Sequence, residues 1–317
     1  MKSPHDTRQA PARHPIAVAA ERTGLSQDVL RIWERRYGVV EPGRGPGGQR
    51  LYADTDIERL ALLHAATSAG RSIGQVARLS TEALSALVDE DIAARERRTA
   101  PAAATPESAD VVNESLALAR SLDAAGLDEL LRGTAATMGV SAFLESVAAP
   151  VLRRLGDEWH AGRLTPAHEH LVSSLLHDMV TQTMRAFARW RDAPTIMVTT
   201  PAGDRHVIGA ALAGAAAAVE GWNVLYLGAD LPAEEVVDAA RAADVRVVAI
   251  SIIYVEHRDR VLGELRVLRA RLPDGVTLIA GGAGAAALTA ELLAMDVQVR
   301  SSIPGLVAEL RRMREGG

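Results

Sequence analysis

The pattern of hydrophobic and polar positions changes twice along the chain. Residues 16–88 have apolar positions spaced as in short helices, and residues 111–190 keep a helical spacing throughout. Between these regions, residues 91–110 read DIAARERRTAPAAATPESAD, and their alanine, proline and charge content is typical of a linker or a frayed helix end. The pattern therefore predicts a first domain over residues 15–90, a linker, and a second domain that is all helical.

The all-helical region divides into four stretches joined by short turns: residues 111–122, 126–139, 140–164 and 165–190. Thr165 stands where a helix N-cap is expected, and Pro166 follows at the first helical position. Four helices of this length with short connections favour an antiparallel four-helix bundle.

After residue 193, apolar runs alternate with helical stretches. The runs are TIMVTT, NVLYLGA, VRVVAIS and VTLIAG, with VQVR as a weaker fifth. This alternation predicts a parallel α/β sheet with right-handed crossovers over residues 193–317. Ligands of such sheets bind outside the carboxyl ends of the strands, and the first run leads directly into PAGDRHVIG, which contains Asp204 and His206.

Composition narrows the classes of function. The chain has 317 residues, 48% of them hydrophobic, which is enough for two or three packed domains. The absence of cysteine excludes disulfides, thiolate metal sites and cysteine nucleophiles. No apolar run is long enough to span a membrane, and the N-terminus lacks the core of a signal peptide, so we expect a cytoplasmic protein without a membrane partner. Residues 1–14 are expected to be a disordered tail.

The first domain has helix-turn-helix spacing, with a helix, a turn at Thr23-Gly24-Leu25, and a second helix capped by Ser26. The formal net charge of -5 gives no global indication of nucleic-acid binding, so a basic surface has to be local. Arginines do recur along the second helix and beside a glycine-rich turn, GRGPGG, that could form a wing: Arg31, Arg35, Arg36, Arg44 and Arg50. Arginine suits phosphate and guanine contacts, although the same pattern also occurs on solvated helix faces.

The stretch LRIWERRYGVVEPGR, followed by GGQRLYADTDIERL, resembles the winged-helix DNA-binding domain of the MerR family. The resemblance covers residues 16 to about 88 and implies a dimer on a two-fold operator. It also implies that the second helix enters the major groove and that the wing touches the DNA backbone. The candidate DNA-binding residues are Arg31, Arg35, Arg36, Tyr37, Arg44, Arg50 and Tyr52. Trp33 is expected to pack in the core instead.

The spacing Asp204-x-His206-x-x-Gly209 follows the first predicted strand. A lone histidine beside an aspartate at a strand end is often a helix cap or a locally satisfied side chain. The triplet, however, resembles the D-x-H-x-x-G signature of the cobalamin-binding fold. That resemblance implies that His206 is the lower cobalt ligand, with Asp204 holding its second nitrogen, and that Gly209 allows close approach of the nucleotide tail.

Further positions extend this resemblance. Ser251 stands where the cobalamin-binding family has S-x-L and the serine meets the base of the tail, although this chain reads SII. Gly281 and Gly282 fit the glycine pair that lines the same slot, or alternatively form an ordinary turn.

Within the helical region, Trp159, Glu169 and His170 have a spacing that resembles the cap of light-sensing MerR regulators of the CarH and LitR type. The resemblance implies that Trp159 and Glu169 enclose the 5'-deoxyadenosyl group and that His170 takes the upper cobalt position after light breaks the cobalt–carbon bond. The remaining histidines of this region have no match in the family and are expected to be bystanders: His160, His168 and His177.

The sequence thus predicts a multidomain α plus α/β protein, with a MerR-type winged helix, a four-helix cap and a flavodoxin-like, Rossmann-type cobalamin-binding domain. We expect a non-enzymatic transcriptional regulator that acts as a repressor. Its expected partners are operator DNA and further copies of the chain, as a dimer or tetramer, and its expected cofactor is light-sensitive adenosylcobalamin. One alternative is a MerR-type regulator that binds cobalamin independently of light. Another is a corrinoid methyl-transfer protein, for which a winged helix has no use.

Overall fold

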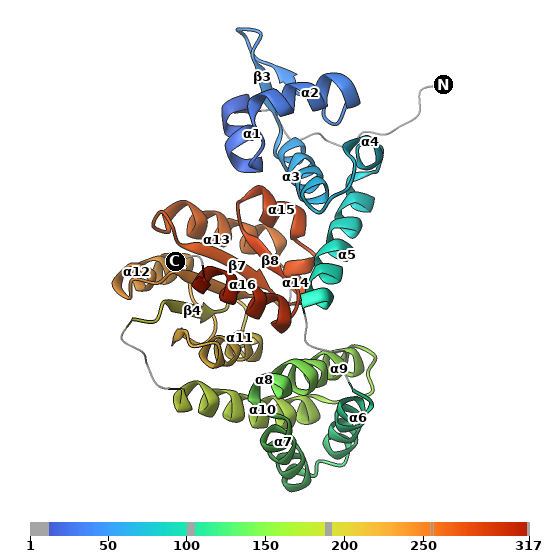
Figure 1. Ribbon diagram of the computed structural model, residues 1–317, viewed down its shortest axis with the longest axis vertical. Helices are drawn as coiled ribbons and strands as arrows, with labels where there is room; N and C mark the ends of the chain where they lie inside the picture. Colours follow the sequence, from blue (N-terminus) through green and yellow to red (C-terminus); the bar gives the residue numbers. More distant parts are fainter. Residues whose placement is uncertain (1–12, 100–104, 188–191, 254, 256, 316–317) are drawn as a thin grey trace. The chain divides into compact units, whose positions relative to one another are not determined.

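The computed structural model describes residues 13–99, 105–187, 192–253, 255 and 257–315. The chain forms two compact units, one from residues 1–94 and 286–299 and the other from residues 95–285 and 300–317. Figure 1 gives the element labels used below.

The N-terminal module is a winged helix. Its elements are β1 (His14–Pro15), α1 (Ile16–Thr23), α2 (Gln27–Tyr37), β2 (Gly43–Arg44), β3 (Arg50–Tyr52), α3 (Asp54–Ser68), α4 (Ile73–Val76) and α5 (Thr81–Thr99). The three strands form an antiparallel sheet in the order β1-β3-β2, so that β2, the glycine-rich turn and β3 make the predicted wing.

Local sequence explains the helix-turn-helix. Gly24 adopts a φ of 67°, a left-handed conformation that glycine reaches without steric cost, and it ends α1. Ser26 then caps α2, because its side chain accepts a hydrogen bond from the Val29 N–H at 3.2 Å. The predicted turn and cap are confirmed. Trp33 is 9% exposed and packs with Leu30 in the core, as expected.

The boundaries of this module differ from the predicted ones. Helix α5 continues to Thr99, so that residues 91–99 of the expected linker are helical, and the next helix begins at Pro106. At the other end, His14 pairs with Tyr52 in the sheet and does not belong to a tail. Arg13 of the predicted tail also donates its backbone N–H to the Tyr52 carbonyl at 3.1 Å, while residues 1–12 of that tail and residues 100–104 of the linker lie outside the described residues.

The helical region forms the predicted bundle. Its elements are α6 (Pro106–Arg120), α7 (Ala124–Met138), α8 (Val140–Phe143), the π-helical turn η1 (Leu144–Ala148), α9 (Ala149–His160) and α10 (Pro166–Ala186). Segments α8, η1 and α9 run on without a break, and together they are the third predicted helix. The π turn lies just before Pro150, which has no N–H to continue the regular hydrogen-bond ladder.

The C-terminal region is a five-stranded sheet in the order β5-β4-β6-β7-β8, as the five apolar runs predict. The strands are β4 (Thr195–Thr199), β5 (Asn223–Tyr226), β6 (Val247–Ser251), β7 (Thr277–Gly281) and β8 (Gln298–Arg300). The pairs β4–β5, β4–β6 and β6–β7 are parallel. The helices are α11 (Ile208–Val219), α12 (Ala233–Ala242), α13 (Arg258–Arg271), α14 (Ala283–Ala286), α15 (Thr289–Ala294) and α16 (Ile303–Glu315).

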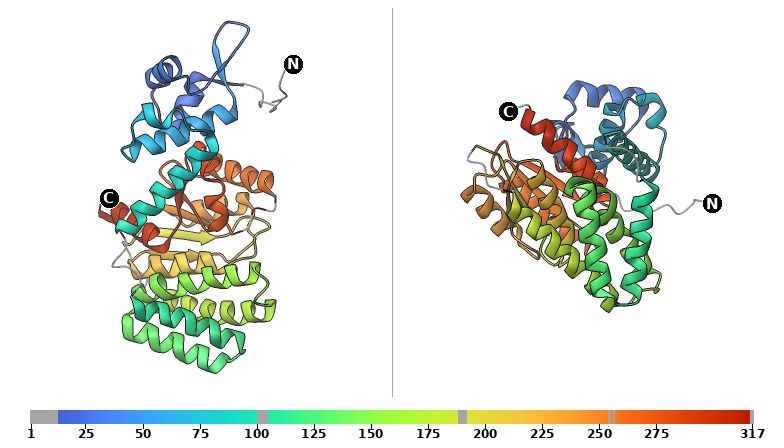
Figure 2. Two further views of the ribbon diagram at one scale, coloured as in Figure 1. Left: turned by 90° about the vertical axis from the view of Figure 1, so that its right-hand side faces the viewer. Right: turned by 60° about the horizontal axis from the view of Figure 1, so that its bottom comes forward.

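Helices α11 and α16 cover one face of the sheet, and α12 and α13 pack together on the other (Figure 1). The bundle adds a further layer on the first face, where α10 lies along α11 (Figure 2). The alanine-rich sequence of α11 permits this close packing. A Cβ added at Gly214 would lie only 2.6 Å from the Met184 sulfur of α10. The bundle and helix α11 therefore share one hydrophobic core, which includes Leu176, Val180 and Ala215.

Candidate functional site

The strand order reverses between β4 and β6, because the chain leaves β4 toward β5 on one side and leaves β6 toward β7 on the other. Such a switch point leaves a crevice at the carboxyl ends of the two strands, where open α/β sheets bind ligands. Asp204 and His206 follow β4 at this edge, and Ser251 ends β6. Topology thus brings the residues of the predicted lower site together.

Asp204 ties the two loops of the switch point to each other. One carboxylate oxygen, Oδ1, accepts a hydrogen bond from the His206 backbone N–H at 2.9 Å and lies 2.8 Å from His206 Nδ1. The other oxygen, Oδ2, accepts from the Ile253 N–H at 2.9 Å. Asp204 is only 7% exposed, so its charge is held by these donors and has little contact with water.

The contact with Asp204 determines how His206 presents its ring. A carboxylate can only accept, so Nδ1 is the donor, and the neutral imidazole then has its lone pair on Nε2. The His206 side chain is 49% exposed while Asp204 is buried. An imidazole with one nitrogen anchored on a carboxylate is the arrangement that metal-ligating histidines use.

A second layer of hydrogen bonds supports this loop. The buried Thr200 hydroxyl donates to the Asp204 carbonyl and accepts from the Asp230 N–H at 2.9 Å. Asp230 in turn accepts from the Gly203 N–H at 2.7 Å. Sequence reasoning missed Thr200 and Asp230, and the only available signal was a polar pair of threonines at the end of an apolar strand.

Two glycines pack closely against the end of β6 and the loop that follows it. A Cβ added at Gly209 would lie 2.4 Å from Ser251 Oγ, and one added at Gly282, where φ is 95°, would lie 2.4 Å from the Ile252 carbonyl oxygen. The Ile253 side chain reaches both, because its Cδ1 would be 3.7 Å and 3.1 Å from these two positions. The structure therefore joins Gly209, Ser251 and Gly282 around Ile253.

Gly281 has different surroundings, because a Cβ added there would meet the Arg300 carbonyl oxygen of β8 at 3.0 Å. Its lack of a side chain serves the spacing between β7 and β8.

The three predicted cap residues lie at the connection between α9 and α10. Trp159 is 41% exposed and stacks edge to face on His160, with 5.0 Å between the ring centroids. Glu169 accepts a hydrogen bond from the Ser173 hydroxyl at 2.5 Å, and His170 Nε2 lies 3.6 Å from Glu169 Oε2. These residues form an aromatic and ionisable surface at one end of the bundle.

A buried carboxylate fixes the connection that carries this surface. Glu158 is 6% exposed and binds Arg163 through both oxygens, at 2.9 and 3.0 Å, and Arg120 of α6 at 2.6 Å. The hydrogen bonds from Arg163, and then those from Arg120, lower the pKa of Glu158 to about 2. Sequence reasoning missed Glu158, although it directly precedes Trp159.

The three bystander histidines have structural contacts. His168 Nδ1 accepts from the Thr165 N–H at 2.9 Å and so caps α10. His160 Nδ1 lies 2.7 Å from the Gly156 carbonyl oxygen, and His177 Nε2 lies 3.0 Å from the Tyr226 hydroxyl. His168 thus has a capping role, and His160 and His177 have polar contacts within the fold.

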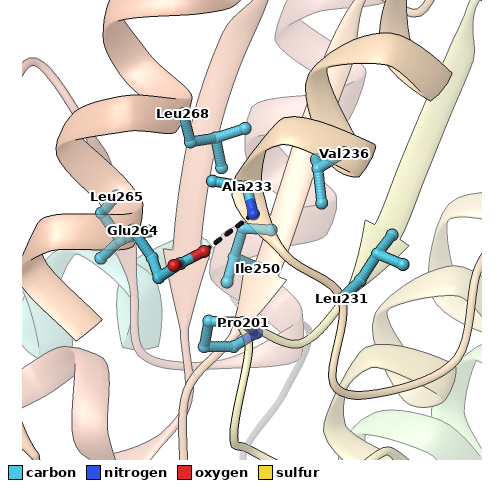
Figure 3. Close-up of a pocket in the computed structure, with 8 residues that line it drawn as sticks. All are labelled: Pro201, Leu231, Ala233, Val236, Ile250, Glu264, Leu265 and Leu268. Carbon is cyan, nitrogen blue, oxygen red and sulfur yellow. Dashed lines mark hydrogen bonds between the residues drawn. The ribbon is translucent and has the colours of Figure 1, made fainter. Parts of the chain in front are cut away.

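Figure 3 shows a small pocket between α12 and α13, lined by Pro201, Leu231, Ala233, Val236, Ile250, Glu264, Leu265 and Leu268. Its one carboxylate, Glu264, accepts a hydrogen bond from the Ala233 N–H at 2.8 Å and thereby caps the first turn of α12. The pocket is otherwise apolar and contains none of the predicted site residues. Within the described part of the chain, no three His, Asp or Glu side chains cluster to hold a metal ion.

The predicted DNA-binding residues divide into exposed and internally paired groups. Arg31, Arg35 and Arg36 lie on the exposed face of α2, and the Arg36 guanidinium lies 5.5 Å from the centre of the Tyr37 ring. Arg44 donates to the Gly48 carbonyl within the wing.

Arg50 and Tyr52 face inward, toward Glu34 of α2. Arg50 pairs with Glu34 at 2.7 Å, and Tyr52 is fully buried with its hydroxyl 3.4 Å from the same carboxylate. Burial, and then the charge of Glu34, raise the pKa of Tyr52 to about 12. The predicted contact of Tyr52 with DNA is corrected to a core position, since its side chain has no exposed surface to offer a phosphate.

Comparison with known proteins agrees with this architecture. Residues 15–83 match the MerR HTH family regulatory protein model, residues 111–182 match a B12 binding domain model, and residues 194–308 match a second B12 binding domain model. The monomethylamine corrinoid protein of Methanosarcina barkeri superposes with a TM-score of 0.52 at 19% identity, covering 64% of this chain and 99% of that one. This likeness shows the fold alone.

Winged helix, bundle and sheet together define a MerR-type regulator with a C-terminal B12-binding module. The chain is 31% identical over 272 residues to the HTH-type transcriptional repressor CarH of Myxococcus xanthus, covering 85% of this chain and 89% of CarH. It is 30% identical over 302 residues to the repressor CarA of the same organism, covering 94% and 96%. The chain belongs to this family of CarH- and CarA-type regulators.

Proposed function

We propose that this protein is a cytoplasmic, cobalamin-dependent transcriptional repressor that senses light through adenosylcobalamin. The observation that carries this proposal is the His206 ring, anchored through Nδ1 on buried Asp204 at the switch point of the sheet. The close packing at Gly209 and Gly282 supports it, because a Cβ at either position would collide with Ser251 or Ile252, so that these two positions of the cobalamin-binding resemblance require glycine. Among the described residues, none of the helices is long and apolar enough to cross a membrane.

In this proposal cobalamin is held from two sides, by residues at the edge of the sheet and by residues at the end of the bundle. His206 would hold the cobalt through Nε2, and Ser251, beside Gly209 and Gly282, would contact the tail base. Trp159 and Glu169 would enclose the adenosyl group from the bundle side, and the exposed His170 ring would be available to the cobalt after illumination. When bound, adenosylcobalamin supplies a cobalt–carbon bond that light breaks.

The regulatory step is a change of assembly. Trp159 would contact the adenosyl group only in the dark form, so this contact would favour the DNA-binding oligomer, a tetramer or dimer, and its loss would favour dissociation. The DNA is bound through α2, where Arg31, Arg35 and Arg36 are exposed. No substrate is converted in this scheme.

Size-exclusion chromatography with absorption spectra tests the proposal on the full chain loaded with adenosylcobalamin, first in the dark and then after illumination. We expect a larger dark oligomer that dissociates in light, with a spectrum typical of two imidazoles on cobalt. His206→Ala should abolish the dark spectrum of the bound cofactor, and His170→Ala should abolish only the light product. His177→Gln is the matched control, because this histidine bonds Tyr226 and is not a predicted ligand.

Each contrary result identifies the part that fails. If cobalamin binds and the size does not respond to light, the protein is a light-independent cobalamin sensor. If His206→Ala binds as the wild type does, Asp204 and His206 are only a helix cap, and the cobalamin site proposed here is wrong.

A further inference from the structure

The exposed face of α2 contains one apolar side chain among charged and polar ones. Its six exposed residues form two neighbouring ridges with a spacing of four residues: Gln27, Arg31 and Arg35 on one, and Asp28, Ile32 and Arg36 on the other. Ile32 is 44% exposed and occupies the middle of its ridge, one turn from Asp28 and one turn from Arg36.

The fold itself does not require an isoleucine at this position. The core side of α2 is filled by Leu30 and Trp33, which are 1% and 9% exposed. A β-branched residue is also a weaker helix former than alanine or leucine. A single exposed apolar residue is common on protein surfaces, so exposure alone carries no conclusion. The significance of Ile32 comes from its place at the centre of the ridge.

The neighbouring charges are arranged so that Ile32 stays accessible. The Arg31 guanidinium donates hydrogen bonds to the Asp28 carboxylate at 2.9 Å and to the Gln27 side-chain oxygen at 3.4 Å, both one turn earlier on α2. Glu34 is turned toward the wing, where Arg50 neutralises it. The ridge therefore has an apolar centre between Asp28, which pairs with Arg31, and the cationic Arg36.

The second helix of a helix-turn-helix presents its exposed face to base edges in the major groove. On those edges, the C5-methyl of thymine is the apolar group that side chains contact. We propose that Ile32 contacts a thymine C5-methyl and so determines the preference for thymine at one position of each operator half-site. This inference rests on the proposed DNA binding through α2.

The test removes the methyl group from the DNA and the apolar side chain from the protein. The full chain, loaded with adenosylcobalamin and kept in the dark, first selects its operator from random duplexes, and each thymine of that operator is then replaced singly by deoxyuridine. Wild-type binding should weaken about four-fold at one position per half-site, the effect of losing one buried methyl. Ile32→Ala should bind the unmodified operator more weakly and should show no response to deoxyuridine at that position.

Val267→Ala is the matched control, because Val267 is an apolar residue of α13 with 38% exposure and should leave the deoxyuridine profile unchanged. Equal deoxyuridine profiles for wild type and Ile32→Ala would overturn the role of Ile32 while leaving DNA binding intact. Selection of no duplex at all would overturn both proposals, so the two failures are distinguishable.

Discussion

The Asp204 carboxylate joins the loop after β4 to the loop after β6, because its Oδ2 accepts a hydrogen bond from the Ile253 backbone N–H at 2.9 Å. The same carboxylate holds His206 through Oδ1. One buried side chain therefore sets the orientation of the proposed cobalt ligand and the position of Ile253, whose side chain packs near Gly209 and Gly282. The orientation of His206 and the packing at these two glycines are coupled through Asp204.

Asp204→Asn should lower the affinity for cobalamin about 10- to 100-fold, as is typical when the partner of a metal-ligating histidine is lost. The reason is that the neutral amide no longer favours the His206 tautomer with its lone pair on Nε2. A titration followed by the absorption spectrum measures the change. Asp238→Asn, on an exposed residue of α12, should leave the affinity unchanged. An Asp204→Asn protein with wild-type affinity would show that His206 needs no anchor.

Gly209→Ala should destabilise the protein by about 1–3 kcal/mol, because the added methyl would lie 2.4 Å from Ser251 Oγ. Pairing it with Ser251→Ala should recover part of the loss, since that change removes the colliding oxygen. Thermal unfolding measures both variants. Gly263→Ala in α13 is the control: its added Cβ meets nothing within 4 Å, so we expect a gain of about 0.5–1 kcal/mol. Equal effects at the two glycines would argue against close packing of Gly209 on Ser251.

Glu158 should make the bundle sensitive to acid. Its pKa in the folded chain is lowered to about 2 by hydrogen bonds from Arg163 and Arg120, and that of an unfolded glutamate is about 4.3. The depressed pKa means that this stabilisation is fully present above about pH 4.3 and is lost as the pH falls toward 2. Unfolding by urea between pH 6 and pH 3 should show a smaller decline for Glu158→Gln, from a lower starting stability.

Glu114→Gln is the matched control for this pH series, because Glu114 is an exposed residue of α6. It should follow the wild-type curve. A Glu158→Gln curve parallel to that of the wild type would mean that the two arginines do not stabilise the ionised carboxylate.

Much of the fold was predictable because hydrophobic periodicity reports it directly. The five apolar runs became the five strands, and the fixed spacing of Asp204 and His206 on one loop was visible along the chain. The networks around Glu158 and Thr200 were not visible, since they join residues about 30 to 40 positions apart in sequence. Such pairings depend on how the helices and strands pack against each other. The hydrophobic pattern of a sequence reports only the relation between neighbouring positions, so it does not reveal them.

Two differences from the predicted picture have similarly physical origins. Residues 91–99 contain alanine, arginine and glutamate, which are strong helix formers, and their charge and proximity to proline fitted either a linker or a frayed helix end. Tyr52 has a polar hydroxyl on a large apolar ring, so its place in a basic wing does not show whether the hydroxyl faces solvent or the interior. In the structure the hydroxyl donates to the Glu34 carboxylate, and the side chain is therefore turned inward.

Trp159→Ala should separate binding from assembly. Trp159 is 41% exposed and stacks on His160, so its removal should cost little stability and leave His206 able to bind cobalamin. If its contact with the adenosyl group supplies a typical coupling energy, the dissociation constant of the dark oligomer should rise about 5- to 150-fold. Analytical ultracentrifugation in the dark measures this, with Phe187→Ala, also exposed at 38%, as the control. A Trp159→Ala protein that assembles as tightly as the wild type would place the coupling elsewhere.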